Sequence, residues 1–158
     1  MKNSIYTAVL LLSMGIALMA CERESTDEII THNTTPELEA QGQYDGTWTR
    51  TIQGDTLVVT APGSIVLEPD TLNAYVGRVT FVSEEFDLNK SSIANIVYAD
   101  KGFVYYNNNA TNEMGTPFYG RIDGDSVNIA SFELRIRVGR KFQYCNFSFE
   151  GPKTGPTL

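Results

Sequence analysis

From Gly42 to Gly151 the sequence alternates apolar and polar residues with a period of two, and this pattern constrains the fold more than any other feature. Such alternation is typical of strands that turn one face to a core and the other to water. Gly, Asn, Asp and Pro interrupt it every eight to twelve residues, which is the spacing of turns in all-β sandwiches and barrels. We therefore predict an all-β domain over residues 42–151.

The clearest strand covers residues 132–138, in which apolar and charged residues occupy opposite faces. The segment 139–141 predicts a turn into a further strand at 142–150, and Asp123-Gly124 predicts a hairpin between strands at 118–122 and 126–129. The remaining predicted strands are 44–52, 56–60, 64–68, 74–83, 93–99 and 102–107, and the longest predicted loops are 84–90 and 107–115. Antiparallel strands in this number must hide their edges, so we expect a single antiparallel up-and-down β-barrel of about eight strands.

The first 20 residues have the organisation of an export signal. Lys2 precedes an apolar run over residues 5–20, which ends in Leu18-Met19-Ala20-Cys21. This ending resembles the bacterial lipobox, and the resemblance implies cleavage after Ala20 and acylation of Cys21. A transmembrane helix is the alternative, but it needs about 20 apolar residues. We predict a signal peptide over residues 1–20 and attachment to the outer membrane, facing the periplasm or the cell surface, through palmitate-like acyl chains on Cys21.

The segment 21–41 carries six acidic residues and one basic residue. A segment so acidic and poor in aromatic residues is predicted to be a disordered tether. Its acidic residues resemble the surface-export signals of Bacteroidetes lipoproteins, and a solvated spacer explains the same residues. Residues 152–158 are predicted to be a flexible tail.

The composition offers little for catalysis. The net charge of −7 disfavours nucleic acid as a partner, although Arg135, Arg137, Arg140 and Lys141 form a local basic cluster. The one histidine, His32, lies in the tether, and Cys145 is the one cysteine left after acylation, which excludes His-based nucleophile systems and His/Cys zinc sites in the barrel. Glu84, Glu85 and Asp87 are expected to form a solvated turn, and the segment 87–98 lacks the glycine and final acid of a calcium loop. We predict no enzyme, no metal and no cofactor.

The motif Gly46-Thr47-Trp48 resembles the Gly-x-Trp that opens lipocalin and calycin barrels. The resemblance implies that Trp48 plugs the base of the barrel and that a late arginine, Arg137 or Arg140, covers its ring. Tyr44 shares the face of Trp48. An ordinary core aromatic is the alternative for Trp48. Over residues 44–151 the chain also resembles small Bacteroidetes lipoproteins that begin with Tyr-x-Gly-x-Trp and end with Phe-x-Gly.

Three tripeptides, beginning at Asp55, Asp70 and Asp125, consist of an aspartate, a hydroxyl residue and an aliphatic residue. They resemble O-glycosylation sites of Bacteroidetes proteins, with Thr56, Thr71 and Ser126 as the acceptors. The alternative is a capped turn, in which the aspartate accepts a backbone hydrogen bond and the aliphatic residue turns inward.

Two functions remain. The first is a binding barrel for a small hydrophobic ligand. The second is a structural or protein-interaction module of the envelope, a barrel-type protease inhibitor included, with a filled interior and contacts through loops such as 105–109. Inward bulky side chains favour the second, whereas Gly46, Gly77 and Gly120 meeting at one level would open a cavity.

Overall fold

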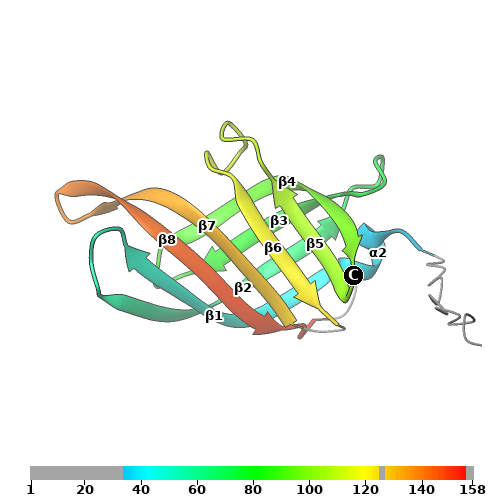
Figure 1. Cartoon of the computed structure of the whole chain (residues 1–158), viewed down its shortest axis with the longest axis horizontal. Coiled ribbons are helices and arrows are strands. Elements are labelled where there is room, and N and C mark those ends of the chain that lie inside the picture. The colour runs from blue at the N-terminus through cyan, green and yellow to red at the C-terminus, as the bar shows by residue number, and fades with distance from the viewer. Residues whose placement is uncertain (1–33, 125–126, 156–158) are drawn as a thin grey trace, which may run out of the picture. The chain divides into compact units, whose positions relative to one another are not determined.

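The computed structural model describes residues 34–124 and 127–155, which form a β-barrel with a short helix at one end (Figure 1). The helix is α2 (Pro36–Ala40). The strands are β1 (Gly42–Ile52), β2 (Val58–Pro69), β3 (Val76–Ser83), β4 (Leu88–Ala99), β5 (Gly102–Asn107), β6 (Phe118–Asp123), β7 (Val127–Val138) and β8 (Lys141–Pro152).

The eight strands form a closed barrel in sequence order. Each strand pairs with its neighbour in antiparallel fashion, and β1 also pairs with β8, with Trp48 opposite Phe149. This closure leaves no unpaired sheet edge. The prediction of an all-β, single antiparallel up-and-down barrel of about eight strands is confirmed.

Two pairs of predicted strands are in fact single strands. The segments 56–60 and 64–68 belong to β2, and 126–129 and 132–138 belong largely to β7. Pro62-Gly63 looked like a turn, but Pro62 is an exposed strand residue and Gly63 makes room for the Trp48 ring. Glycine in a strand often marks such a close approach instead of a turn.

The prediction of a disordered tether up to residue 41 is wrong for residues 34–41. The helix α2 buries Pro36, Glu37 and Ala40, and the backbone N–H of Tyr75 donates to Glu37 Oε2 at 2.9 Å. Pro36 stands at the start of the helix, where its missing N–H costs nothing. The buried carboxylate is tolerated because it accepts a backbone hydrogen bond.

The C-terminal segment is also held against the barrel as far as Gly155. Lys153 forms a β-bridge with Tyr44, and the backbone N–H of Thr154 donates to the carbonyl of Gln43 at 2.9 Å. The prediction of a flexible tail is therefore wrong for residues 152–155. The signal peptide, Cys21 and His32 lie outside the described residues. Within the described part of the chain, no helix is long and apolar enough to cross a membrane.

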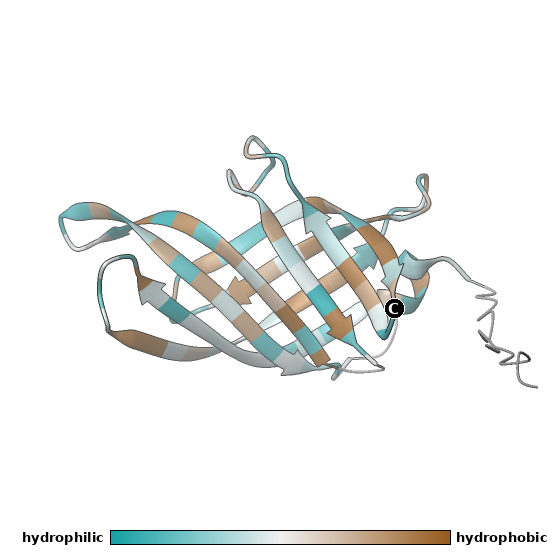
Figure 2. Ribbon diagram, in the orientation of Figure 1, coloured by the Kyte–Doolittle hydropathy of each residue, from teal (hydrophilic) through white to brown (hydrophobic). Residues whose placement is uncertain are grey.

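Apolar and polar residues alternate along the strands, as Figure 2 shows. The inward residues form one core, whose centre is a group of six packed aromatic rings. The centroids of contacting rings are 4.9–6.5 Å apart in this aromatic cluster, which consists of Trp48, Phe81, Phe118, Phe132, Phe147 and Phe149.

Candidate functional site

The two ends of the barrel differ in how they are covered. At the helix end, α2 lies beside β2 and β4, and it accepts hydrogen bonds from Tyr44 of β1 and from Tyr75, just before β3 (Figure 1). At the opposite end, here called the hairpin end, the β1–β2, β3–β4, β5–β6 and β7–β8 connections meet water. The site must therefore be sought separately at each end and in between.

Two buried tyrosines towards the helix end are hydrogen-bonded within the chain. The Tyr44 hydroxyl donates to the carbonyl of Ala40 at 2.7 Å, and the Tyr105 hydroxyl donates to Asn128 Oδ1 at 2.7 Å. All four residues are buried. Burial raises the pKa of both tyrosines well above the ordinary value of 10.0. Asn128 Nδ2 has no partner among the described residues.

Trp48 lies in the middle of the barrel. It is fully buried, its indole N–H donates to the carbonyl of Val82 at 2.9 Å, and its ring lies 4.9 Å from that of Phe149. It is the centre of the aromatic cluster and not a plug at the base. Tyr44 lies four residues nearer the helix end.

The three interior glycines do not open a cavity. A Cβ at Gly120 would lie 2.0 Å from the ring of Tyr105, and one at Gly77 would lie 2.7 Å from Ile96 Cδ1. At Gly46 a Cβ would lie 2.1 Å from the carbonyl oxygen of Glu150. Neighbouring atoms occupy the space that these glycines free. The middle of the barrel is therefore filled.

A pocket with a volume of about 500 Å³ lies at the hairpin end. Phe86 from the β3–β4 turn and Met114 from the β5–β6 loop line it, and both are buried. Leu134 and Ile136 of β7 contribute further apolar surface. The remaining lining residues are charged: Arg50, Lys90, Arg135, Arg137, Glu85 and Asp87.

Arg50 is the least exposed of the charged residues that line this pocket. It stands opposite Val59 on β2 and the inward Phe147 on β8, and its guanidinium carbon lies 4.6 Å from the centroid of the Phe86 ring. Its Nε is buried and has no hydrogen-bond partner among the described residues. A guanidinium has five donors and normally pairs with a carboxylate or a phosphate.

Cys145 occupies the next inward position of β8. It is a free, fully buried cysteine, as its place on the face of Phe147 and Phe149 predicted. Burial raises the pKa of its thiol, and the charge of Arg50 opposes that rise. The neutral thiol therefore acts as a small apolar side chain.

Arg137 does not cover Trp48, so that expectation is wrong. Arg137 and Arg140 are exposed, and Arg137 Nε donates to the carbonyl of Gly139 at 3.1 Å within the β7–β8 turn. Odd positions of β7 face outward, because the even positions hold the core residues. The inward arginine is Arg50, and its even spacing from Tyr44 and Trp48 was the signal that could have revealed it.

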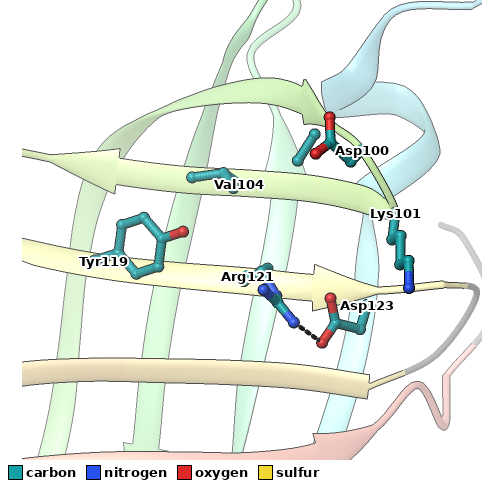
Figure 3. Close-up of a pocket in the computed structure, with 7 residues that line it drawn as sticks. Asp100, Lys101, Val104, Tyr119, Arg121 and Asp123 are labelled. Carbon is teal, nitrogen blue, oxygen red and sulfur yellow. Dashed lines mark hydrogen bonds and ion pairs between the residues drawn. The ribbon is translucent and has the colours of Figure 1, made fainter.

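Another pocket, with a volume of about 400 Å³, lies on the outer face of the barrel near the β4–β5 turn (Figure 3). Val104 and Tyr119 line it, and Arg121 and Asp123 form an ion pair there, drawn as a dashed line in Figure 3. Because the arginine already has a carboxylate partner, this pocket offers less for a charged ligand than the hairpin end does.

The proposed glycosylation acceptors Thr56 and Thr71 are exposed. The turn-capping interpretation also finds support, since Asp55 Oδ1 accepts from Leu57 N at 3.1 Å and Asp70 Oδ1 accepts from Leu72 N at 2.8 Å. The aliphatic residues do not turn inward, however: Leu72 is 89% exposed. The third acceptor, Ser126, lies outside the described residues.

The other sequence candidates are readily placed. Glu84, Glu85 and Asp87 are exposed in the β3–β4 turn, as expected. Tyr105, expected in a contact loop, is instead buried. Within residues 34–124 and 127–155, no group of three or more His, Cys, Asp or Glu side chains is arranged to hold a metal ion.

No protein-family model, no curated protein and no solved structure matches this chain. The function is therefore argued from the geometry of the hairpin end.

Proposed function

We propose that this chain is a non-enzymatic, membrane-anchored envelope lipoprotein whose barrel binds a small hydrophobic ligand at the hairpin end. One observation carries the proposal: the pocket of about 500 Å³ at that end, whose mixed lining includes the apolar residues Phe86, Met114, Leu134 and Ile136. Its volume lies within the range typical of small-molecule sites, about 300–1,000 Å³. The ligand lies at the end of the barrel and not in its middle, because the aromatic cluster fills the middle.

The pocket combines a firm wall with an open side. Phe86 packs edge-on against Phe147, with ring centroids 5.9 Å apart, so the wall continues the aromatic cluster. Leu134 and Ile136 are only half-buried, and a ligand that covered them would remove apolar surface from water. Such burial contributes about 25 cal/mol for each Å².

Native mass spectrometry of the delipidated protein, purified from its own host, tests the ligand proposal. We expect a retained small molecule that is lost in Leu134→Glu, which places a charge in the pocket wall. The matched control is Ile129→Glu, an exposed position of the same strand, which should keep the ligand. If both variants fold, as verified by thermal melting, and both retain the small molecule, the ligand does not bind in this pocket.

The membrane anchor rests on Leu18-Met19-Ala20-Cys21. A single acyl chain binds a membrane only marginally, whereas two chains hold a protein stably, so we propose a diacylated Cys21 in the outer membrane. Metabolic labelling with a clickable palmitate should mark the wild type and leave Cys21→Ser unlabelled. Equal labelling of the two proteins would refute the lipoprotein assignment.

A protein-interaction module of the envelope is the second candidate. Exposed apolar side chains on two neighbouring hairpins favour it, namely Leu57 and Val58 near the β1–β2 turn and Phe142 and Tyr144 on β8. If this candidate is correct, the native spectrum shows a protein partner instead of a small molecule. Phe142→Ser would then release that partner, and the Leu134→Glu variant would keep it.

A further inference from the structure

We propose that the hairpin-end pocket selects an anionic amphiphile, whose oxyanion group pairs with Arg50 while its apolar part lies against Phe86 and Leu134. The inference rests on the proposed function and specifies its ligand class. Three observations carry it: the state of the Arg50 guanidinium, the charges around it, and the contrast with other arginines.

The Arg50 side chain is held in place but lacks an anion. Its guanidinium lies on the Phe86 ring at 4.6 Å, and that ring is itself fixed against Phe147. Its Nε is shielded from water without a hydrogen-bond partner in the described chain. The side chain as a whole is only partly buried, but a buried donor without a partner costs free energy, and a ligand oxyanion that accepted from Nε would recover that cost.

Two other arginines with a defined environment already have their anions. Arg78 lies 2.9 Å from Glu113, and Arg121 is paired with Asp123. Glu85 and Asp87 line the same pocket as Arg50, yet no ion pair joins Arg50 to a carboxylate among the described residues. Unlike Arg78 and Arg121, Arg50 is thus available to pair with an anionic ligand.

The charge around the pocket has the opposite sign to that of the chain. Four bases line it, Arg50, Lys90, Arg135 and Arg137, against the two acids Glu85 and Asp87, whereas the whole chain carries −7. A local positive field raises the concentration of anions at the pocket. The apolar residues beside it, Phe86, Met114, Leu134 and Ile136, require that the anion carry an apolar portion.

Isothermal titration calorimetry with ten-carbon probes tests this selectivity. The full chain carrying Cys21→Ser avoids acylation, and the probes, used below their critical micelle concentrations, are decanoate, decyl phosphate, decanol and decylammonium. We expect decanoate or decyl phosphate to bind roughly 10- to 100-fold more tightly than decanol, since hydrogen bonds to charged groups contribute about 1.5–3 kcal/mol. The preference between the first two probes distinguishes a carboxylate from a phosphate headgroup.

The variants assign the selectivity to Arg50. Arg50→Met should bring the affinity for the anions down to that for decanol and leave decanol binding unchanged. Arg50→Lys should keep part of the selectivity, because it keeps the charge but loses the planar fork. The matched control, Arg78→Met, removes an arginine outside the pocket and should keep the full selectivity.

A spectroscopic measurement covers the case in which Arg50→Met does not fold. The Nε–H resonance of Arg50, assigned by its loss in Arg50→Lys, should shift on addition of decanoate and not on addition of decanol. An unshifted resonance, equal affinity for decanoate and decanol, or preference for decylammonium overturns the anion inference while the apolar pocket stands. Failure of all four probes to bind, decanol included, counts against the proposed ligand function as well.

Discussion

The two ends of this barrel are built from the same eight strands but treat buried polar groups differently. At the helix end, the hydroxyls of Tyr44 and Tyr105 and the carboxylate of Glu37 all find partners within the chain. The atom left without a partner there, among the described residues, is a neutral amide nitrogen, Asn128 Nδ2. At the hairpin end the corresponding atom is Nε of the cationic Arg50. A buried polar group with a hydrogen-bond partner stabilises a fold, whereas a buried group without one costs free energy that a ligand can recover by bonding to it.

The two ends differ because segments outside the eight strands cover the helix end. The helix α2 brings the carbonyl of Ala40 and the carboxylate of Glu37 to the helix end, and residues 153–155 extend the pairing of β1 there. The hairpin end receives only turns and loops, of which Phe86 and Met114 cover it in part. One end thus serves stability, and the other is left available for a ligand. Three predictions test this division.

The substitution with the largest expected effect on stability is in the aromatic cluster, which lies between the two ends. Trp48→Ala removes a fully buried ring that packs against four phenylalanines, and such changes cost about 3–5 kcal/mol in the free energy of unfolding. Thermal and urea unfolding measure it. The control Thr47→Ala, at an exposed neighbouring position, should cost less than about 0.5 kcal/mol. If both variants unfold with the wild type, Trp48 does not hold the two ends together.

The helix end is distinguished by its response to alkaline pH. Because burial raises the pKa of Tyr44 and Tyr105 above the ordinary 10.0, the folded state favours their protonated, neutral form. The resulting stability is fully present below pH 10 and is lost as the pH rises above it, by up to about 1.4 kcal/mol per pH unit for each tyrosine. Chemical unfolding at several pH values between about 8 and 12, where tyrosine titrates, measures how steeply the free energy of unfolding falls with pH.

Substitutions assign that slope to the helix end. Tyr105→Phe should make it shallower, although the loss of the hydroxyl lowers the stability at neutral pH. Tyr119→Phe, on the exposed outer face, should leave the slope as in the wild type. An unchanged slope in Tyr105→Phe would show that the alkaline transition begins elsewhere.

The smallest expected effect concerns the rate at which Cys145, at the hairpin end, is alkylated. Cys145 is fully buried opposite Leu134, which lines the pocket. The raised pKa of its thiol lowers the thiolate fraction. In the chain carrying Cys21→Ser, alkylation by iodoacetamide should be slower by roughly 100-fold or more in the native than in the denatured state, because it requires local opening. Fast stoichiometric alkylation of the folded protein would show that the hairpin end opens down to the core.

The barrel could be predicted from the sequence because alternation is a local signal. Phe132, Leu134 and Ile136 follow it without a break, and the same period correctly placed Tyr44, Trp48 and Cys145 inside. The strand boundaries were harder, because Pro62-Gly63 has the composition of a turn. The structure gives this glycine another role, because the Trp48 ring from the neighbouring strand β1 lies directly over Gly63.

The candidate site was less predictable, since it depends on contacts between distant residues. The acidic composition around Glu37 favoured disorder, and its ordering requires a backbone donor from Tyr75, far along the chain. The family resemblance suggested Arg137 or Arg140, whereas the arginine on the inward face is Arg50, which it did not point to. Its lack of a partner could not be predicted, because it depends on where the turn containing Glu85 and Asp87 comes to lie.

The pairing of β1 with β8 has a consequence for how the chain folds. Seven of the eight strand pairings join neighbours in sequence, but this seam joins residues 47–52 to residues 145–150. The entropy of closing a loop rises with its length, and contacts between distant residues slow folding. The hairpins can therefore form early, whereas β1 and β8 can pair only after both strands have been synthesised. Until then β1 and β8 are open edges, so a nascent or partly unfolded molecule is most prone to associate with others along this seam.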